Sequence, residues 1–184
     1  MAKILGITNS KDSGCALLID GEVIAAANEE RFNKQKLTQE FPYQSLQYVL
    51  SEGGVTLENI EAIGIGMWGG IEPAHGFLQY VREVTEKVSE DSSCRDIILE
   101  RLRGSIESDS IKRKLFQDGI KQAGLDCKPL YTCDHHTAHA LTASYFSPFN
   151  ESLILTLDGR GDHLSGSLRA WDRQSGFKLL QSIS

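Results

Sequence analysis

Histidines cluster in one short stretch of this chain. His135, His136 and His139 follow Asp134, and the segment Asp158-Gly159-Arg160-Gly161-Asp162 comes shortly after them. Imidazole nitrogens are common metal ligands, and glycines beside carboxylates let backbone N–H groups approach an oxyanion. A metal site next to a phosphate-accepting turn indicates an enzyme that handles a nucleotide or an acyl phosphate.

The histidines are predicted to lie at the start of a helix. Asp134 is a good N-cap residue, and Pro148 ends the element. Residues four apart share a helix face, so His135 and His139 can hold one ion while His136 points about 100° away. The positive end of the helix dipole favours a neutral, ligating imidazole at His135. The alternative is that these are ordinary surface or core histidines, and no third ligand stands out after them.

The glycine-rich segment is predicted to be a turn at the end of a buried strand. Largely apolar residues, 153–157, lead directly into Asp158. Gly159 and Gly161 would let the backbone cradle a phosphate, while Asp158 and Asp162 hold a cation or orient a water. A valine at Gly161 is therefore expected to obstruct phosphate and leave metal content nearly unchanged. The alternative is a simple hairpin turn.

The composition is that of a globular protein with one sizeable core. The chain has 184 residues, of which 40% are hydrophobic and 24% charged. Its net charge of −6 argues against a nucleic-acid partner, and the lack of a long apolar stretch argues against a membrane span. Four cysteines without a Cys-x-x-Cys pair predict reduced thiols and a cytoplasmic protein.

The elements that must position these residues follow an α/β pattern. Strands are predicted at 3–8, 14–20, 22–28, 60–67 and 128–132, the last just before the histidine helix. A helix is predicted at 42–50, and two or three helices over 72–124 with breaks near 91–93 and Gly104. This order predicts an antiparallel trio of strands added to a parallel, helix-covered sheet.

The opening pattern then repeats. Segments 153–158, 165–171 and 177–183 follow the order of the first three strands, with a polar turn after the first strand in each copy. Duplicated lobes of this plan are typical of the actin/sugar-kinase/Hsp70 (ribonuclease H-like) superfold. The expected domains are a first lobe at 1–150 and the opening strands of a truncated second lobe at 151–184. Self-association through 153–183 is expected, because unpaired strand edges are prone to it.

Several motifs carry a family resemblance from Lys3 to about Trp171. They are Ile4-Leu5-Gly6-Ile7, Asp12-Ser13 before Ala16-Leu17-Leu18, Asp20-Gly21, Glu29-Glu30-Arg31-Phe32, Phe41-Pro42, His135-His136-x-x-His139-Ala140, Ser147-Pro148-Phe149 and Asp158-Gly159-x-Gly161-Asp162. With these motifs the chain resembles the N-terminal part of the NodU/CmcH carbamoyltransferase family. That family is similar to the Kae1/TsaD threonylcarbamoyl-transfer proteins.

The resemblance implies a chemistry. ATP and carbamoyl phosphate form a carbamoyl-adenylate in a YrdC-like domain further along the chain, and the Kae1-like domain passes the carbamoyl group to a hydroxyl or amine of a small-molecule acceptor. The pair matching His135 and His139 binds a divalent ion, usually iron, together with an aspartate of the second lobe. Without the second lobe and the YrdC-like domain in cis, the isolated chain is expected to be inactive.

The motifs and the resemblance together give a set of predicted site residues. The metal ligands are His135 and His139, and the catalytic residues are Asp158 and Lys11. The predicted substrate or phosphate contacts are Asp12, Ser13, Arg31, Gly159, Gly161 and Asp162.

Two positions depart from the family pattern. Lys11 stands where the family usually has histidine, and Leu37 replaces the histidine of a Lys-His pair. Lys11 offers a cation to phosphate but is not a neutral base at pH 7, and Leu37 can do neither. Glu29, Glu30 and Arg31 are either substrate contacts or the charged end of a strand.

Two other functions stay open at this point. One is a sugar or acetate kinase of the same superfold, against which the paired histidines count, because such kinases bind Mg²⁺ through oxygen ligands. The other is a metal- or nucleotide-binding module without transfer activity, which the substitutions at Lys11 and Leu37 favour.

Overall fold

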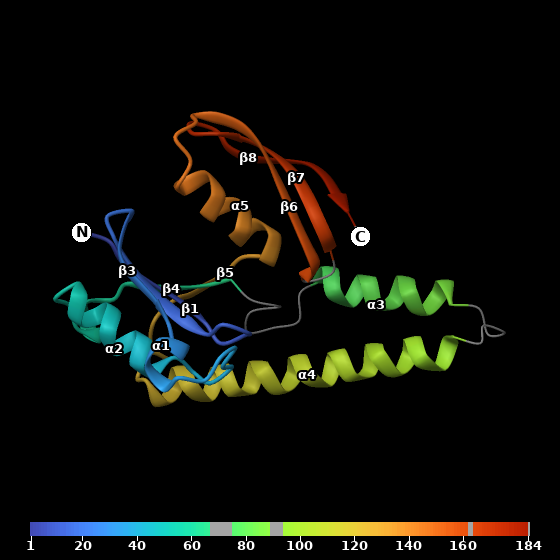
Figure 1. Ribbon diagram of the computed structural model, residues 1–184, viewed down its shortest axis with the longest axis horizontal. Coiled ribbons are helices and arrows are strands. Elements are labelled where there is room, and N and C mark those ends of the chain that lie inside the picture. The colour runs from blue at the N-terminus through green and yellow to red at the C-terminus, as the bar shows by residue number, and fades with distance from the viewer. Residues whose placement is uncertain (67–74, 89–93, 162–163, 184) are drawn as a thin grey trace.

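The computed structural model describes residues 1–66, 75–88, 94–161 and 164–183. Within these ranges the chain forms a mixed α/β fold with two β-sheets, and helix α5 (His135–Tyr145) lies between them (Figure 1).

The first sheet is mixed, with strand order β3-β2-β1-β4-β5. Its strands are β1 (Lys3–Thr8), β2 (Gly14–Ile19), β3 (Glu22–Asn28), β4 (Ala62–Ile65) and β5 (Leu130–Thr132). The first three pair antiparallel, while β4 pairs parallel with both β1 and β5. The predicted antiparallel trio on a parallel sheet is therefore confirmed.

The two faces of this sheet differ. On one face Leu5, Leu17 and Ile63 are fully buried and join a core with Val49 of α2 (Tyr43–Glu52) and Phe116 of α4 (Arg95–Gln122). On the other face the register aligns small residues in one row across four strands: Ala26, Ala16, Gly6 and Gly64. Because side chains alternate between faces, the large residues build the core and the small ones leave space above the sheet.

The remaining helices correct part of the expected helical region. Helix α3 (His75–Lys87) precedes α4, and α4 continues without a break through Gly104, where one was predicted (Figure 1). The other expected break, at 91–93, lies outside the described residues. A short helix α1 (Glu30–Asn33) and a 3-10 turn (Leu57–Asn59) were not predicted. No helix in the described ranges is long and apolar enough to cross a membrane.

The second sheet is an antiparallel meander of β6 (Glu151–Gly161), β7 (Leu164–Asp172) and β8 (Gly176–Ile183). Strand β6 runs through the predicted turn as far as Gly161, with a register shift between Leu157 and Gly161. Helix α5 covers one face, and the other exposes Leu153, Leu155 and Leu157. This apolar row is consistent with the expected self-association. That association and the lobe boundary at 150 stay predictions.

Two glycines of α4 give a matched test of its packing. A Cβ at Gly119 would overlap the buried ring of Phe41, whereas one at Gly104 would meet open space. Gly119→Ala is therefore expected to lower the free energy of unfolding by about 1–3 kcal/mol through overpacking. Gly104→Ala should raise it by about 0.5–1 kcal/mol, since alanine favours a helix interior. Urea denaturation measures both. A destabilising Gly104→Ala would contradict the unbroken helix.

Candidate metal centre and adjoining cavity

Helix α5 begins at the predicted N-cap. Asp134 has an extended backbone, and its carboxylate accepts hydrogen bonds from the N–H (2.9 Å) and the hydroxyl of Thr137. Burial acts to raise the pKa of Asp134, but these hydrogen bonds and the nearby Arg169 guanidinium outweigh it and lower the pKa. The carboxylate therefore stays ionised and fixes the first turn that carries the histidines.

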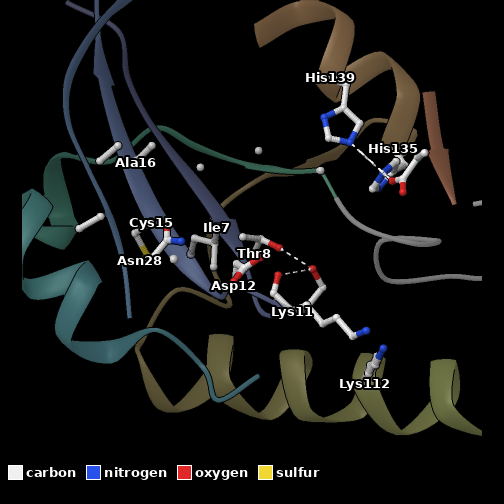
Figure 2. Close-up of a pocket in the computed structure, with 18 of the residues that line it drawn as sticks. Ile7, Thr8, Lys11, Asp12, Cys15, Ala16, Asn28, Lys112, His135 and His139 are labelled. Carbon is white, nitrogen blue, oxygen red and sulfur yellow. Dashed lines mark hydrogen bonds and ion pairs between the residues drawn. The ribbon is translucent and has the colours of Figure 1, made fainter. Parts of the chain in front are cut away.

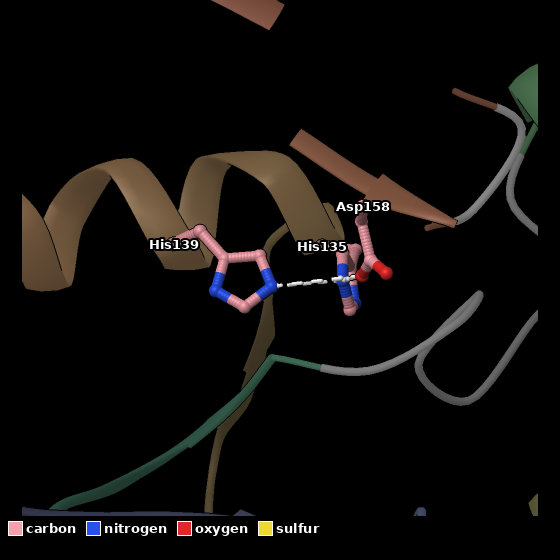
Figure 3. A group of neighbouring side chains, drawn as sticks. All are labelled: His135, His139 and Asp158. Atoms are coloured by element: carbon pink, nitrogen blue, oxygen red, sulfur yellow. Dashed lines mark hydrogen bonds and ion pairs between the residues drawn. The ribbon is translucent and has the colours of Figure 1, made fainter. Parts of the chain in front are cut away.

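Three side chains converge at this helix end (Figure 3). His135 Nε2 lies 2.6 Å from Asp158 Oδ2 and 2.9 Å from His139 Nε2. The His139 nitrogen is 3.9 Å from the same Asp158 oxygen. Asp158 comes from the far end of β6, so the third member of the cluster is a residue predicted for catalysis. The sequence next to the histidines offered no third ligand, and the structure brings Asp158, from the predicted second lobe, to this position.

The donor set fits a divalent metal ion. One potential ligand atom from each of the three residues lies within 4.8 Å of the others. Metal bonds of about 2.0–2.2 Å place adjacent ligand atoms about 3 Å apart, close to these separations. Partial burial, and then the neighbouring His135, lower the pKa of His139 against an opposing effect of Asp158. The hydrogen bond with His135 lowers the pKa of Asp158. A neutral imidazole and an ionised carboxylate are the forms that bind metal.

His136 has a different role from its two neighbours. It is 1% exposed, and its Nδ1 lies 2.9 Å from the Thr156 hydroxyl while its Nε2 lies 3.1 Å from the Leu164 carbonyl. A carbonyl only accepts, so Nε2 carries the proton and donates it to Leu164. Thr156 in turn contacts the Ser167 hydroxyl at 2.8 Å. His136 therefore joins α5 to the second sheet.

A cavity of about 1510 Å³ adjoins the cluster. His135, His139 and Asp158 contribute to its wall, and so do Lys11 and Asp12 of the β1–β2 turn (Figure 2). Arg31 lines it as well, at 3.7 Å from Glu30. The metal cluster and three of the predicted substrate-contacting or catalytic residues thus face one space.

The other predicted contacts lie elsewhere. Ser13 is fully buried, with its N–H on the Thr38 carbonyl and its own carbonyl accepting from Glu29, so it packs the turn and does not line the cavity. The Gly159 N–H donates to Asp158 at 2.6 Å and orients that carboxylate, in place of the predicted phosphate contact.

Gly161 has a steric role at the cluster. It lies against the ring of His135, which a Cβ at this position would overlap. The glycine therefore gives the ring of His135, a predicted metal ligand, its space, and the predicted phosphate contact of Gly161 stays a prediction. Asp162 lies outside the described residues.

The residues of the Glu29–Arg31 segment have different roles, so neither alternative, substrate contacts or the charged end of a strand, holds for all of them. Glu29 is 3% exposed, and its carboxylate accepts from the N–H groups of Gln44 and Ser45 and from the Ser45 hydroxyl. It caps the start of α2, whereas Arg31 faces the cavity. Burial, and then the Glu29 charge, raise the pKa of the nearby Cys15 thiol, so Cys15 lines the cavity as an inert thiol. Each of the four cysteines, all within the described residues, carries a thiol and is not half of a disulfide.

Sequence reasoning missed the cavity wall formed by α4. Arg101, Ser105, Ser108 and Lys112 line the cavity from one face of this helix. Their spacing of four, three and four residues is a helical signal that could have identified them as one group. It gave no indication of which element they face.

Comparisons with known proteins identify the family of this chain. Residues 3–182 match the family described as carbamoyltransferase N-terminus, and the chain belongs to that family. It is 35% identical over 163 residues to the nodulation protein NolNO of Sinorhizobium fredii, covering 85% of this chain and 21% of that protein. It is 32% identical over 186 residues to the Synechocystis protein sll1178, covering 95% of this chain and 28% of that protein. The chain thus spans less than a third of these relatives.

Among solved structures, YeaZ from Pseudomonas aeruginosa superposes with a TM-score of 0.48 and 16% sequence identity. The match covers 99% of this chain and 65% of that one. A second structure, of a protein with similarity to YeaZ, gives a TM-score of 0.46 at the same identity.

The three histidines should respond differently to substitution. His136→Ala removes the hydrogen bonds of the buried ring to the Leu164 carbonyl and the Thr156 hydroxyl, which should cost about 1–3 kcal/mol of stability. His139→Ala removes a half-exposed ring and should change stability by less than about 0.5 kcal/mol. In elemental analysis after metal loading, His139→Ala should lose the ion, and folded His136→Ala should retain most of it. Equal metal loss in both variants would contradict this division.

Gly161 and Gly159 provide a second matched pair. Gly161→Ala should displace the His135 ring and weaken metal affinity by at least about tenfold, as expected when a ligand is misoriented. Gly159→Ala meets open space and should stay within about twofold. Calorimetric titration with Zn²⁺ measures both affinities. Undiminished metal binding by a folded Gly161→Ala protein would show that the glycine does not serve the metal ligand.

Proposed function

We propose that this chain supplies the metal centre of a carbamoyltransferase, in which carbamoyl phosphate and ATP provide the carbamoyl group for a hydroxyl or amine of a small molecule. The observation that carries the proposal is the convergence of His135, His139 and Asp158 on the wall of the cavity that Lys11 and Asp12 also line. Membership of the carbamoyltransferase N-terminus family supports the choice of chemistry.

The three residues would hold a divalent ion, for which we propose iron. Bound there, such an ion would supply Lewis-acid polarisation of a carbonyl or phosphoryl oxygen. Other residues of the chain orient the ligand side chains and add positive charge to the cavity. Gly159 orients Asp158 by a hydrogen bond, and Asp134 fixes the helix turn that presents His135. Arg31 and Lys11 bring positive charge to the same cavity.

The architecture of the whole enzyme is part of the proposal. The first sheet with its helices would form one lobe of an actin-like domain, and β6–β8 would open the second lobe. The YrdC-like domain that forms the carbamoyl-adenylate would follow in longer relatives. This division is supported by the repeated three-strand order in the two sheets.

Ligand affinity is the property of this chain that tests the proposal. Carbamoyl phosphate should bind at least about tenfold more tightly when the metal site is loaded with Fe²⁺ under anaerobic conditions than after chelation, as a direct metal contact predicts. His139→Ala should remove that difference. Isothermal titration calorimetry of the wild-type and variant chains measures both effects.

Inorganic phosphate serves as the control ligand, because it lacks the carbamoyl carbonyl. Its affinity should depend less on the metal than that of carbamoyl phosphate. An affinity for carbamoyl phosphate that is the same with and without the metal would contradict the proposal. Metal-dependent binding of ATP or a sugar alone would favour a kinase of the same superfold.

A further inference from the structure

Helix α4 has two different faces. Toward its carboxyl end, Phe116 and Ile120 pack into the core of the first sheet. Further toward its start, Arg101, Ser108 and Lys112 face the cavity. The core contacts therefore anchor the carboxyl end of the helix, and the polar side chains before it form one wall of the cavity.

Two lysines extend into the cavity from separate elements. Figure 2 shows Lys11, from the β1–β2 turn, and Lys112, from α4, pointing toward one another. Their positions are 101 residues apart in the sequence. In the described part of the chain, neither ammonium group has a carboxylate within ion-pair distance. Two like charges that share a space repel each other unless an anion lies between them.

The charge of the cavity contrasts with that of the chain. The protein carries a net charge of −6, yet the residues lining the cavity include four cations, Lys11, Arg31, Arg101 and Lys112. Two carboxylates oppose them: Asp12, and Asp158, which is directed to His135. A cavity that collects positive charge in an acidic protein favours an anionic ligand.

We propose that Lys11 and Lys112 together bind one phosphate group of the substrate, as a two-lysine site on the wall away from the metal cluster. A phosphate at neutral pH carries up to two negative charges and several acceptor oxygens, which suit two ammonium groups. The site takes a compound with a terminal phosphate, either an acyl phosphate or a nucleotide. Lys112 becomes a binding residue that the sequence motifs do not include.

This inference deepens the proposed function, and its choice of an acyl phosphate rests on it, but the lysine site can be tested without metal. Calorimetric titration in the presence of EDTA compares inorganic phosphate, carbamoyl phosphate and ATP as ligands of the 184-residue chain. Lys11→Gln and Lys112→Gln should each weaken the tightest of the three by at least about fivefold, the loss of one charged hydrogen bond. Lys112→Arg, which keeps the charge, should recover most of the affinity.

Lys114→Gln is the matched control. Lys114 lies on the same helix, is exposed and does not line the cavity. This variant should bind within about twofold of the wild type, since it removes the same charge outside the site. Thermal melts of all variants establish that each is folded.

The outcomes separate the two proposals. Tighter binding of carbamoyl phosphate identifies an acyl-phosphate site, and tighter binding of ATP identifies a nucleotide site. If the lysine variants lose affinity while metal has no effect on the wild type, the two-lysine site stands and the metal-dependent function fails. Wild-type affinity in Lys112→Gln, equal loss in Lys114→Gln, or no binding of any of the three ligands to the wild type would overturn the inference.

Discussion

The attachment of α5 to the second sheet is the interaction on which the site depends. A buried series of polar groups runs from Arg169 through Ser167 and Thr156 to His136, with contacts of 3.1, 2.8 and 2.9 Å. It ends at the Leu164 carbonyl. Buried polar groups are costly without partners, so this network permits one alignment of helix and sheet. That alignment brings His135 and His139 to the carboxylate of Asp158 near the end of β6.

The same helix also sets the distance to the first sheet. Gly66, just after β4, lies against Ala138 of α5, since an added Cβ would come 3.1 Å from the alanine side chain and require that side chain to shift. One side of α5 therefore contacts the second sheet and another approaches the carboxyl end of β4. The row of small residues on the first sheet faces the space that remains, which explains why the cavity opens there and the core lies on the opposite face.

Two walls of the cavity carry different kinds of side chain. The α5 and β6 wall offers two imidazoles and a carboxylate, which suit a metal ion, and the β1–β2 turn with α4 offers ammonium groups, which suit a phosphate. A carbamoyl phosphate carries both a carbonyl and a phosphate, so a ligand of this kind could use both walls at once. Family membership supports the carbamoyl chemistry that we propose, and the distribution of charge supports an anionic ligand in the same cavity.

The sequence by itself determined what depends on neighbours a few residues away. Strand bounds at β1 and β3, the Asp134 cap and the shared face of His135 and His139 follow from local spacing, and the structure has all of them. Only the tertiary structure decided the rest. Asp158 joins His135 and His139 in the candidate metal cluster, Gly161 makes room for His135, and Lys112 lines the same cavity as Lys11, because folding brings distant segments together. The alternating and helical periods of a sequence state which face a side chain occupies, but the partner across that face is set by long-range packing.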